Sequence, residues 1–317
     1  MKILMQLRKN SKIFIAGHKG MVGSSILRLL KKKGYKKLFT VDKSKVDFTN
    51  QIQTKKYLNK IKPDFVVIAA AKVGGIMANK NYKADFIYQN LMIQNNLIHS
   101  SYLVGVKKLI FLGSSCIYPK YSKQPIKESE LLTGKLEETN DAYAIAKIAG
   151  LKLCEAYNIQ YKLNYICLMP SNLYGPNDNY DLKSSHFFPA LISKIYDAKI
   201  NNKKNIKIWG NGLVKRELMH VDDLSRACEH FLKKRTKHSL INIGSGNENS
   251  IISYAKFICK KLSVKLKFIY DNKKPIGTPR KRLNINLSKS YGWKSTINLS
   301  KGFDITFKDF LTKYKSI

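Results

Sequence analysis

Apolar residues in the first half of the chain form short runs, separated by stretches whose apolar positions recur with a helical period. The run from Asp64 to Ala70 is almost continuously apolar, as in a strand buried on both faces. Between two such runs, Ser24 to Lys33 places its leucines and an isoleucine on one side, which predicts a helix. The pattern predicts strands over 12–16, 37–41, 64–70, 108–113 and 163–169, and helices over 24–33, 84–104 and 143–157.

Strands that alternate with helices in this way predict an α/β fold, with a doubly wound parallel sheet covered by helices on both faces. After Pro170 the pattern loosens, and Pro, Gly and Asn become frequent. A helix over 251–262, a strand over 266–270 and a loop over 273–280 follow. We therefore predict a first domain over 1–170 with return segments near 206–245. A smaller C-terminal α/β lobe is predicted from 171–205 and 246–317.

Composition narrows the class of protein. The chain has 317 residues, of which 44% are hydrophobic, and this is typical of a globular protein. Its five cysteines are scattered and include no CxxC pair, so neither a disulfide framework nor a metal site is predicted. No apolar run approaches the ~18 residues that span a bilayer, and the first ten residues lack a signal-peptide pattern. We expect a soluble, cytoplasmic protein without a membrane partner.

The formal charge of +37 raises the question of a nucleic-acid partner. The excess comes almost entirely from 51 Lys spread along the chain, against 7 Arg. Arginine, which forms bidentate contacts with phosphates and bases, is therefore scarce. We interpret the charge as a lysine-rich surface and predict no nucleic-acid partner, with a functional basic surface as the alternative. A small anionic substrate would suit such a field.

A glycine motif follows the first predicted strand. Gly17-His18-Lys19-Gly20-Met21-Val22-Gly23 has glycines three apart and opens the first helix. Glycine permits a tight turn and lets a pyrophosphate approach the backbone at a helix N-terminus. In its strand-turn-helix context the motif predicts dinucleotide binding by these seven residues. An ordinary tight turn is the alternative.

A tyrosine and a lysine four residues apart form the second candidate site. Tyr143 and Lys147 share one face of a predicted helix that Asn140 or Asp141 can cap. A free phenol titrates near ~10, but a neighbouring ammonium and the positive nicotinamide would lower that pKa. Tyr143 is then a usable general acid or base. Ser114, at the end of a strand, could hold a substrate oxygen beside the phenol. A surface Tyr-Lys pair is the alternative.

Together these motifs resemble the extended short-chain dehydrogenase/reductase family, which has a Rossmann fold. Longer blocks resemble one group within it, the GDP-L-fucose synthases, from about Lys12 to the C-terminal end. Ala-Lys-Val-Gly-Gly-Ile at 71–76 and Gly-Ser-Ser-Cys-Ile-Tyr-Pro at 113–119 are specific to that group. The matching blocks are 14–24, 69–76, 84–90, 111–120, 143–150, 172–176, 220–223 and 277–281.

The resemblance implies a reaction. These enzymes convert GDP-4-keto-6-deoxy-D-mannose to GDP-L-fucose by epimerising C3 and C5 and then reducing the C4 ketone with NADPH. Cys116 matches their epimerisation base and His186 their acid. Tyr143, with Lys147 and Ser114, serves the reduction. The four other cysteines are expected in the core. Alternatives are another NAD(P)-dependent sugar-nucleotide epimerase/reductase, or a non-catalytic nucleotide- or nucleic-acid-binding Rossmann protein.

The resemblance also implies the binding residues. Lys194, Trp209, Arg216 and Arg280 match the family's nucleotide-sugar contacts. The chain departs at Ile276, where an Asp is common, which puts one guanosine or ribose contact in doubt. Besides the glycine motif, the cofactor contacts are Leu112, Gly113, Ser114, Ser115, Lys147, Pro170, Ser171, Asn172, Leu173 and His186.

The choice of cofactor depends on the end of the second strand. Asp42 there could hold the ribose hydroxyls of NAD and repel the phosphate of NADP. Lys19 and Lys43 could instead meet a 2′-phosphate. We predict NADPH, with NADH as the alternative. The resemblance further implies a homodimer formed through the helices over 84–104 and 143–157.

Overall fold

The computed structural model describes residues 6–182, 184–273 and 277–314. Its centre is a six-stranded sheet in the order β2-β1-β3-β4-β5-β9, and every neighbouring pair in it is parallel. The prediction of a doubly wound parallel sheet is confirmed. The strands are β1 (Lys12–Ala16), β2 (Lys37–Phe39), β3 (Phe65–Ile68), β4 (Lys108–Leu112), β5 (Asn164–Pro170) and β9 (Leu240–Ile243).

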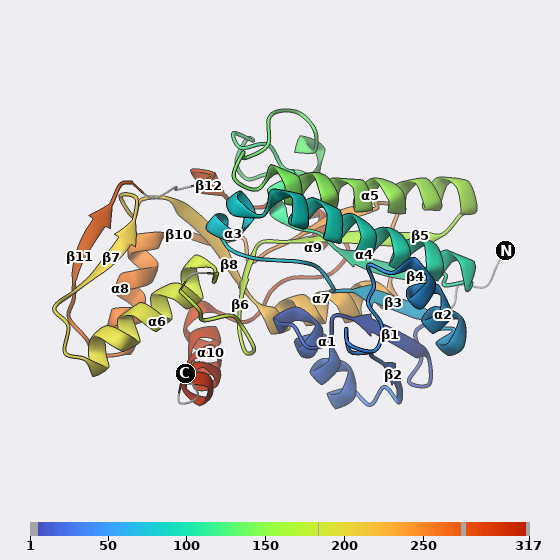
Figure 1. Ribbon diagram of the computed structural model, residues 1–317, viewed down its shortest axis with the longest axis horizontal. Coiled ribbons are helices and arrows are strands. Elements are labelled where there is room, and N and C mark those ends of the chain that lie inside the picture. The colour runs from blue at the N-terminus through green and yellow to red at the C-terminus, as the bar shows by residue number, and fades with distance from the viewer. Residues whose placement is uncertain (1–5, 183, 274–276, 315–317) are drawn as a thin grey trace.

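Helices cover both faces of this sheet (Figure 1). On one face α1 (Met21–Lys32) packs against α7 (Val221–Lys233). On the other lie α2 (Gln51–Ile61), α4 (Lys83–Leu103) and α5 (Asp141–Tyr161). Successive strand residues point to opposite faces, so Ile13 and Ile15 join the core under α1, while Phe14 joins the core under α4 and α5. This explains why the central strands are apolar at every position.

The remaining elements form a lobe beside the sheet, on the left in Figure 1. Its third core is rich in aromatic side chains, including Phe188, Tyr254 and Phe310. In one of its small sheets β8 pairs with three strands, and in the other β7 pairs with β11. The elements are β6 (Asn172–Tyr174), α6 (Phe187–Ile200), β7 (Asn205–Trp209), β8 (Lys215–His220), β10 (Glu248–Ser250), α8 (Ile251–Lys261), β11 (Lys267–Asp271), β12 (Arg280–Lys281) and α10 (Leu299–Tyr314).

Shorter elements complete the chain: α3 (Ile76–Asn81), α9 (Asn286–Ser290) and two 3₁₀ turns at Ser115–Ile117 and Glu128–Glu130. Among the described residues, no helix has the length and apolar character that crossing a membrane requires.

The pattern did not predict α2, α6, α7 or the sixth strand β9, and it placed the start of the first helix too late. That helix begins at Met21 rather than Ser24, because Gly20 is its N-cap with an extended backbone (φ −73°, ψ 166°). The last three residues of the glycine motif therefore form the first helical turn. This places the free backbone N–H groups of that turn directly at the motif.

Candidate active site

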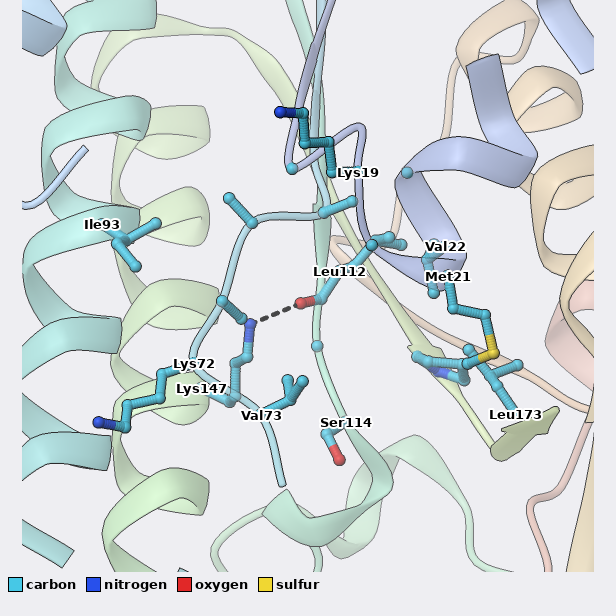
Figure 2. A pocket seen from close by; sticks show the side chains of 18 of the residues that line it. Lys19, Met21, Val22, Lys72, Val73, Ile93, Leu112, Ser114, Lys147 and Leu173 are labelled. Atoms are coloured by element: carbon cyan, nitrogen blue, oxygen red, sulfur yellow. Dashed lines mark hydrogen bonds between the residues drawn. The ribbon is translucent and has the colours of Figure 1, made fainter. Parts of the chain in front are cut away.

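One cleft of about 610 Å³ lies at the carboxyl ends of β1 to β5. Ligands bind at this edge of parallel α/β sheets. Figure 2 shows Met21, Val22 and Leu173 on one side of the cleft and Ile93 of α4 on the opposite side. The wall contains all the residues that sequence reasoning assigned to a dinucleotide: Gly17, His18, Lys19, Gly20, Met21, Val22, Gly23, Leu112, Gly113, Ser114, Ser115, Lys147, Pro170, Ser171, Asn172, Leu173 and His186.

The glycine motif forms a tightly packed cradle at one end of this cleft. Gly17 has φ +86°, and a Cβ there would lie 2.6 Å from the backbone nitrogen of Ala70. A Cβ on Gly23 would lie 2.1 Å from the carbonyl oxygen of Gly17. Backbone atoms therefore pack directly against one another in this turn and leave no room for a side chain at Gly17 or Gly23. The first-turn N–H groups of α1 have no partner within the helix. Such a helix N-terminus fits a pyrophosphate.

Gly23→Ala is expected to destabilise the protein by about 2 kcal/mol or more, because neither the added methyl group nor the Gly17 carbonyl has room to move. Thermal unfolding measures this. Gly20→Ala is the matched control: its φ is −73° and its nearest new contact would be 3.6 Å away, so it should unfold near the wild-type temperature. Equal stability of the two variants would contradict this account of the loop.

Beside the glycine motif, Asp42 is held by two basic side chains of that motif. Its carboxylate lies 2.9 Å from Lys19 Nζ and 3.3 Å from His18 Nε2. The hydrogen bond from Lys19 lowers the pKa of Asp42 below its usual value. Lys43 is 75% exposed and lies 3.9 Å from Asp47. The Asp42 carboxylate, which was expected to repel the 2′-phosphate of NADP, is thus already paired.

Tyr143 and Lys147 meet at the other end, on the first turns of α5. Lys147 Nζ lies 5.7 Å from the centre of the Tyr143 ring and donates a 2.9 Å hydrogen bond to the carbonyl oxygen of Leu112 (Figure 2). The ring of Phe86 packs edge-on against Tyr143. Asn140 is the N-cap residue of α5, but its side chain makes no capping bond, contrary to one expected option. Tertiary contacts therefore hold the pair in place.

The protein's own groups do not lower the pKa of Tyr143. Burial, with a contribution from Cys116, raises the pKa of Tyr143 above its usual value, and burial lowers that of Lys147 to about 8. The prediction of a lowered pKa for Tyr143 depended on two positive charges, those of Lys147 and of the nicotinamide. Without that charge, desolvation of the phenolate outweighs the ammonium. The buried phenol therefore carries its proton.

Ser114 and Cys116 lie where β4 ends. Ser114 is the N-cap of the 3₁₀ turn, and its Oγ accepts a 3.4 Å hydrogen bond from the Cys116 backbone. Cys116 is only 6% exposed. Burial raises the pKa of the Cys116 thiol, whereas the ammonium of Lys281, the hydroxyl of Ser114 and Lys147 lower it. The thiol is therefore within electrostatic reach of both Tyr143 and Lys281.

His186 enters the same cleft from the lobe. It is the N-cap of α6 with an extended backbone (φ −72°, ψ 166°), and its side chain forms part of the cleft wall. Burial and the Lys281 ammonium lower the pKa of His186, so the imidazole is neutral at pH 7. A neutral imidazole can relay a proton, because one ring nitrogen can give its proton while the other takes one up.

Sequence reasoning assigned no role to Lys281 or Glu137. Lys281, on β12, pairs in register with Arg216 of β8. Its ammonium lowers the pKa of both Cys116 and His186. Glu137 is buried, and its carboxylate lies 3.0 Å from Lys120 Nζ. Burial lowers the pKa of both Arg216 and Lys281, and the charge of Glu137 partly opposes this by raising it. No local pattern distinguishes one lysine among 51.

The candidate substrate residues lie outside the wall of this cleft. Lys194 Nζ is 6.0 Å from the Trp209 ring and donates to the carbonyl oxygen of Lys207 at 3.2 Å. Burial lowers the pKa of Arg216 to about 10, so its guanidinium keeps its charge. Arg280 donates to Glu248 at 2.7 Å. Ile276 lies outside the described residues.

Known proteins share this architecture over nearly the whole chain. A GDP-L-fucose synthase from Sinorhizobium fredii is 49% identical over 308 residues, covering 97% of this chain and 98% of that protein. One from Escherichia coli is 45% identical over 309 residues, covering 95% and 96%. The structure of a Campylobacter jejuni GDP-mannoheptose C4 reductase with NADP bound superposes with a TM-score of 0.88 at 36% identity, covering 96% of this chain and 99% of that one.

A family model matches more than half of the chain. Residues 13–244 match the NAD dependent epimerase/dehydratase family, and they include the glycine cradle, Ser114, Tyr143, Lys147 and His186. With the relatives above, this shows that the chain belongs to the NAD dependent epimerase/dehydratase family.

Proposed function

We propose that this protein converts GDP-4-keto-6-deoxy-D-mannose to GDP-L-fucose, by epimerisation at C3 and C5 and NADPH-dependent reduction at C4. One observation carries the proposal. The two sets of groups that the two kinds of chemistry need meet at one end of a single cleft: Tyr143, Lys147 and His186 line it, and Cys116 is buried in the 3₁₀ turn that begins at the lining residue Ser115. The near full-length similarity to GDP-L-fucose synthases supports the choice of substrate.

The cleft is proposed to bind the cofactor along its length. The first-turn N–H groups of α1 would hold the pyrophosphate, and Leu112 to Ser115 and Pro170 to Leu173 would border the nicotinamide end. When bound, NADPH supplies the hydride that reduces C4. Lys147, already turned into the cleft, would exchange its bond to Leu112 for the nicotinamide ribose. Its positive charge also favours loss of the proton from Tyr143.

The epimerisations need a base and an acid on opposite faces of the sugar. C3 and C5 are both α to the ketone, so their C–H protons are acidic. The Cys116 thiolate takes one proton, which leaves an enolate, and His186 returns a proton to the other face of the same carbon. The sulfur gains the proton that the carbon loses and returns it to water, while the second ring nitrogen of His186 takes a proton from water as the first gives one to the carbon, so both side chains end in their starting states. Lys281 stabilises the thiolate because its ammonium lowers the pKa of Cys116.

The reduction uses the remaining acid. As hydride reaches C4, negative charge develops on the ketone oxygen, and Tyr143 donates its proton to that oxygen. Ser114 is proposed to hold the oxygen beside the phenol. The GDP part is proposed to extend into the lobe, with Lys194 and Arg216 facing the diphosphate and Trp209, at 36% exposure, packing on the nucleotide. Arg280, on the strand that carries Lys281, is a further contact.

The direct experiment mixes purified protein, NADPH and GDP-4-keto-6-deoxy-D-mannose, follows NADPH oxidation and identifies the sugar formed. GDP-L-fucose is the expected product. A reduced sugar that is not epimerised would show a plain C4 reductase and overturn the roles of Cys116 and His186. If the protein binds NADPH but does not oxidise it, the substrate assignment is wrong and another sugar nucleotide is the substrate. GDP-heptoses are then the next substrates to test, given the similarity to a GDP-mannoheptose C4 reductase.

Cofactor preference should respond to Asp42. Asp42→Asn is expected to raise kcat/KM for NADPH about fivefold to tenfold relative to NADH. The change removes a negative charge near the 2′-phosphate and frees the Lys19 ammonium, which is 73% exposed, to meet it. Steady-state rates with both cofactors measure the ratio. Asp197→Asn, which removes one carboxylate in the lobe, is the control and should leave the ratio unchanged. An unchanged ratio in Asp42→Asn contradicts this role.

We also propose that the protein is a homodimer formed through α4 and α5. These helices pack against each other and still leave large apolar side chains exposed: Tyr88 at 63%, Ile145 at 47% and Ile159 at 72%. Exposed apolar side chains grouped on two adjacent helices favour a protein interface. Light scattering after size exclusion tests the proposal, and a monomer at micromolar concentration overturns it.

A further inference from the structure

The segment after β6 lies between the glycine motif and the C-terminal helix α10 (Figure 1). Asn177, in this segment, donates its side-chain amide to the carbonyl oxygen of Lys19 at 2.6 Å. The same nitrogen lies 3.4 Å from Ser24 Oγ, on the first turns of α1. Asn177 has φ +69°, a conformation that Asn and Gly adopt far more readily than other residues. Its unusual backbone conformation thus serves a contact with the cofactor loop.

The C-terminal helix holds the other polar groups of Asn177. Asp309 accepts a 2.8 Å hydrogen bond from the backbone N–H of Asn177. Lys313 donates from Nζ to the Asn177 side-chain oxygen at 3.1 Å and lies 3.4 Å from Asp309. Two charged side chains of the lobe therefore hold Asn177 on one side, while the glycine motif takes its amide on the other.

This contact acts on a peptide group next to the proposed pyrophosphate site. The peptide between Lys19 and Gly20 is bonded at both ends, because the Gly20 N–H donates to Gly17 O at 3.1 Å and the Lys19 carbonyl accepts from Asn177. A peptide held at both ends cannot rotate without breaking a hydrogen bond. The residues directly after it, Met21 and Val22, carry first-turn N–H groups that are free of intrahelical partners.

We propose that Asn177 is a positioning residue for the dinucleotide, and that Lys313 and Asp309 of α10 act on cofactor affinity through it. None of the three lines the cleft, so none touches the cofactor in this arrangement. The C-terminal helix, which belongs to the lobe, thereby supports the phosphate-binding loop of the other domain. The inference rests on the cofactor part of the proposed function and is independent of which sugar nucleotide is the substrate.

The test is a titration of the full chain with NADPH, followed by nicotinamide fluorescence, together with thermal unfolding. Asn177→Gly removes the side chain at a backbone conformation that glycine tolerates, and should raise the Kd about threefold to tenfold, the loss expected for one hydrogen bond. Lys313→Met should raise it about twofold to threefold. Lys308→Met, an exposed lysine on the same helix, is the matched control and should leave the Kd unchanged.

Two further variants distinguish positioning from a structural role. Asn177→Asp keeps the size of the side chain and its tolerance of positive φ but replaces the N–H donor with a charged oxygen that repels the Lys19 carbonyl, so its Kd should rise at least as much as in Asn177→Gly. In the double variant Asn177→Gly, Lys313→Met, the Kd should equal that of Asn177→Gly alone, because Lys313, which also donates to the carbonyl oxygen of Asp178 at 3.3 Å, reaches the glycine motif only through the Asn177 side chain.

The inference is overturned if unfolding temperatures fall while every Kd stays at the wild-type value, or if the effects of Asn177→Gly and Lys313→Met are additive. A wild-type affinity in Asn177→Asp also overturns it. Because no sugar nucleotide is present in the titration, a wrong substrate assignment leaves these results unaffected. Failure of the wild-type chain to bind NADPH would instead show that the cofactor assignment is wrong, and the inference with it.

Discussion

Tyr143→Phe is expected to lower the rate of NADPH oxidation by about a thousandfold, within the range for loss of a general acid. The substitution removes only the phenolic O–H, so the alkoxide that forms at C4 loses its proton donor. The aromatic ring, which packs edge-on against Phe86, remains. The rate is measured under saturating NADPH and sugar nucleotide. Tyr161→Phe, at the C-terminal end of the same helix, is the matched control and should keep the wild-type rate.

The same variant tests the division of labour in the cleft. In deuterated water Tyr143→Phe should still exchange the hydrogens at C3 and C5, because Cys116 and His186 are intact. Mass spectrometry of the recovered sugar nucleotide measures this exchange. If exchange disappears together with reduction, Tyr143 takes part in both steps and the proposed division is wrong.

Cys116→Ser is expected to lower the rate of epimerisation by about a hundredfold to ten thousandfold and to leave the Kd for NADPH unchanged. Serine is close to cysteine in size, but its hydroxyl does not ionise near neutral pH and cannot act as the base. Exchange at C3 and C5 measures the effect. Cys259→Ser is the control, because this thiol is in the core of the lobe, away from the cleft. Normal formation of GDP-L-fucose by Cys116→Ser would contradict the assignment.

The pH dependence of exchange follows from the pKa of this thiol. Burial raises the pKa of Cys116 above its usual value, so at neutral pH the thiolate is a minor species and its fraction grows as pH rises. Exchange should therefore accelerate with pH through the neutral range. Lys281 lowers the same pKa, so Lys281→Met should move this rise to higher pH and slow exchange at pH 7.5. An unshifted profile would show that Lys281 does not act on the thiol.

Features that depend on neighbouring residues could be predicted from the sequence. The strand, the glycine motif and the helix over 12–32 follow one another directly along the chain. Their order is therefore enough to predict the cradle. Tyr143 and Lys147 lie four apart on a helix, and that spacing alone places them together. The resemblance to a known family added Cys116 and His186, which no local pattern would have selected.

Three features depended on parts of the chain that are distant in sequence. Asp42 is paired with Lys19, so its charge does not stand alone against a 2′-phosphate. The pKa of Tyr143 is set by burial, which composition does not report. The peptide before the N-cap residue Gly20, at the start of α1, is held by Asn177 through the Lys19 carbonyl. Each depends on which groups surround a side chain or peptide once the chain has folded.

The fold class, the dinucleotide cradle and the Tyr143–Lys147 pair could be predicted without a structure, because each is encoded by the periodicity of a helix or strand or by a turn that requires glycine. The folded chain was needed to show that Lys281 lowers the pKa of both Cys116 and His186, and that Asn177 joins α10 to the Lys19 carbonyl. Charges and hydrogen bonds act over a few ångströms of space, whatever the separation along the chain. A lysine-rich sequence therefore contains many candidate partners, and folding selects among them.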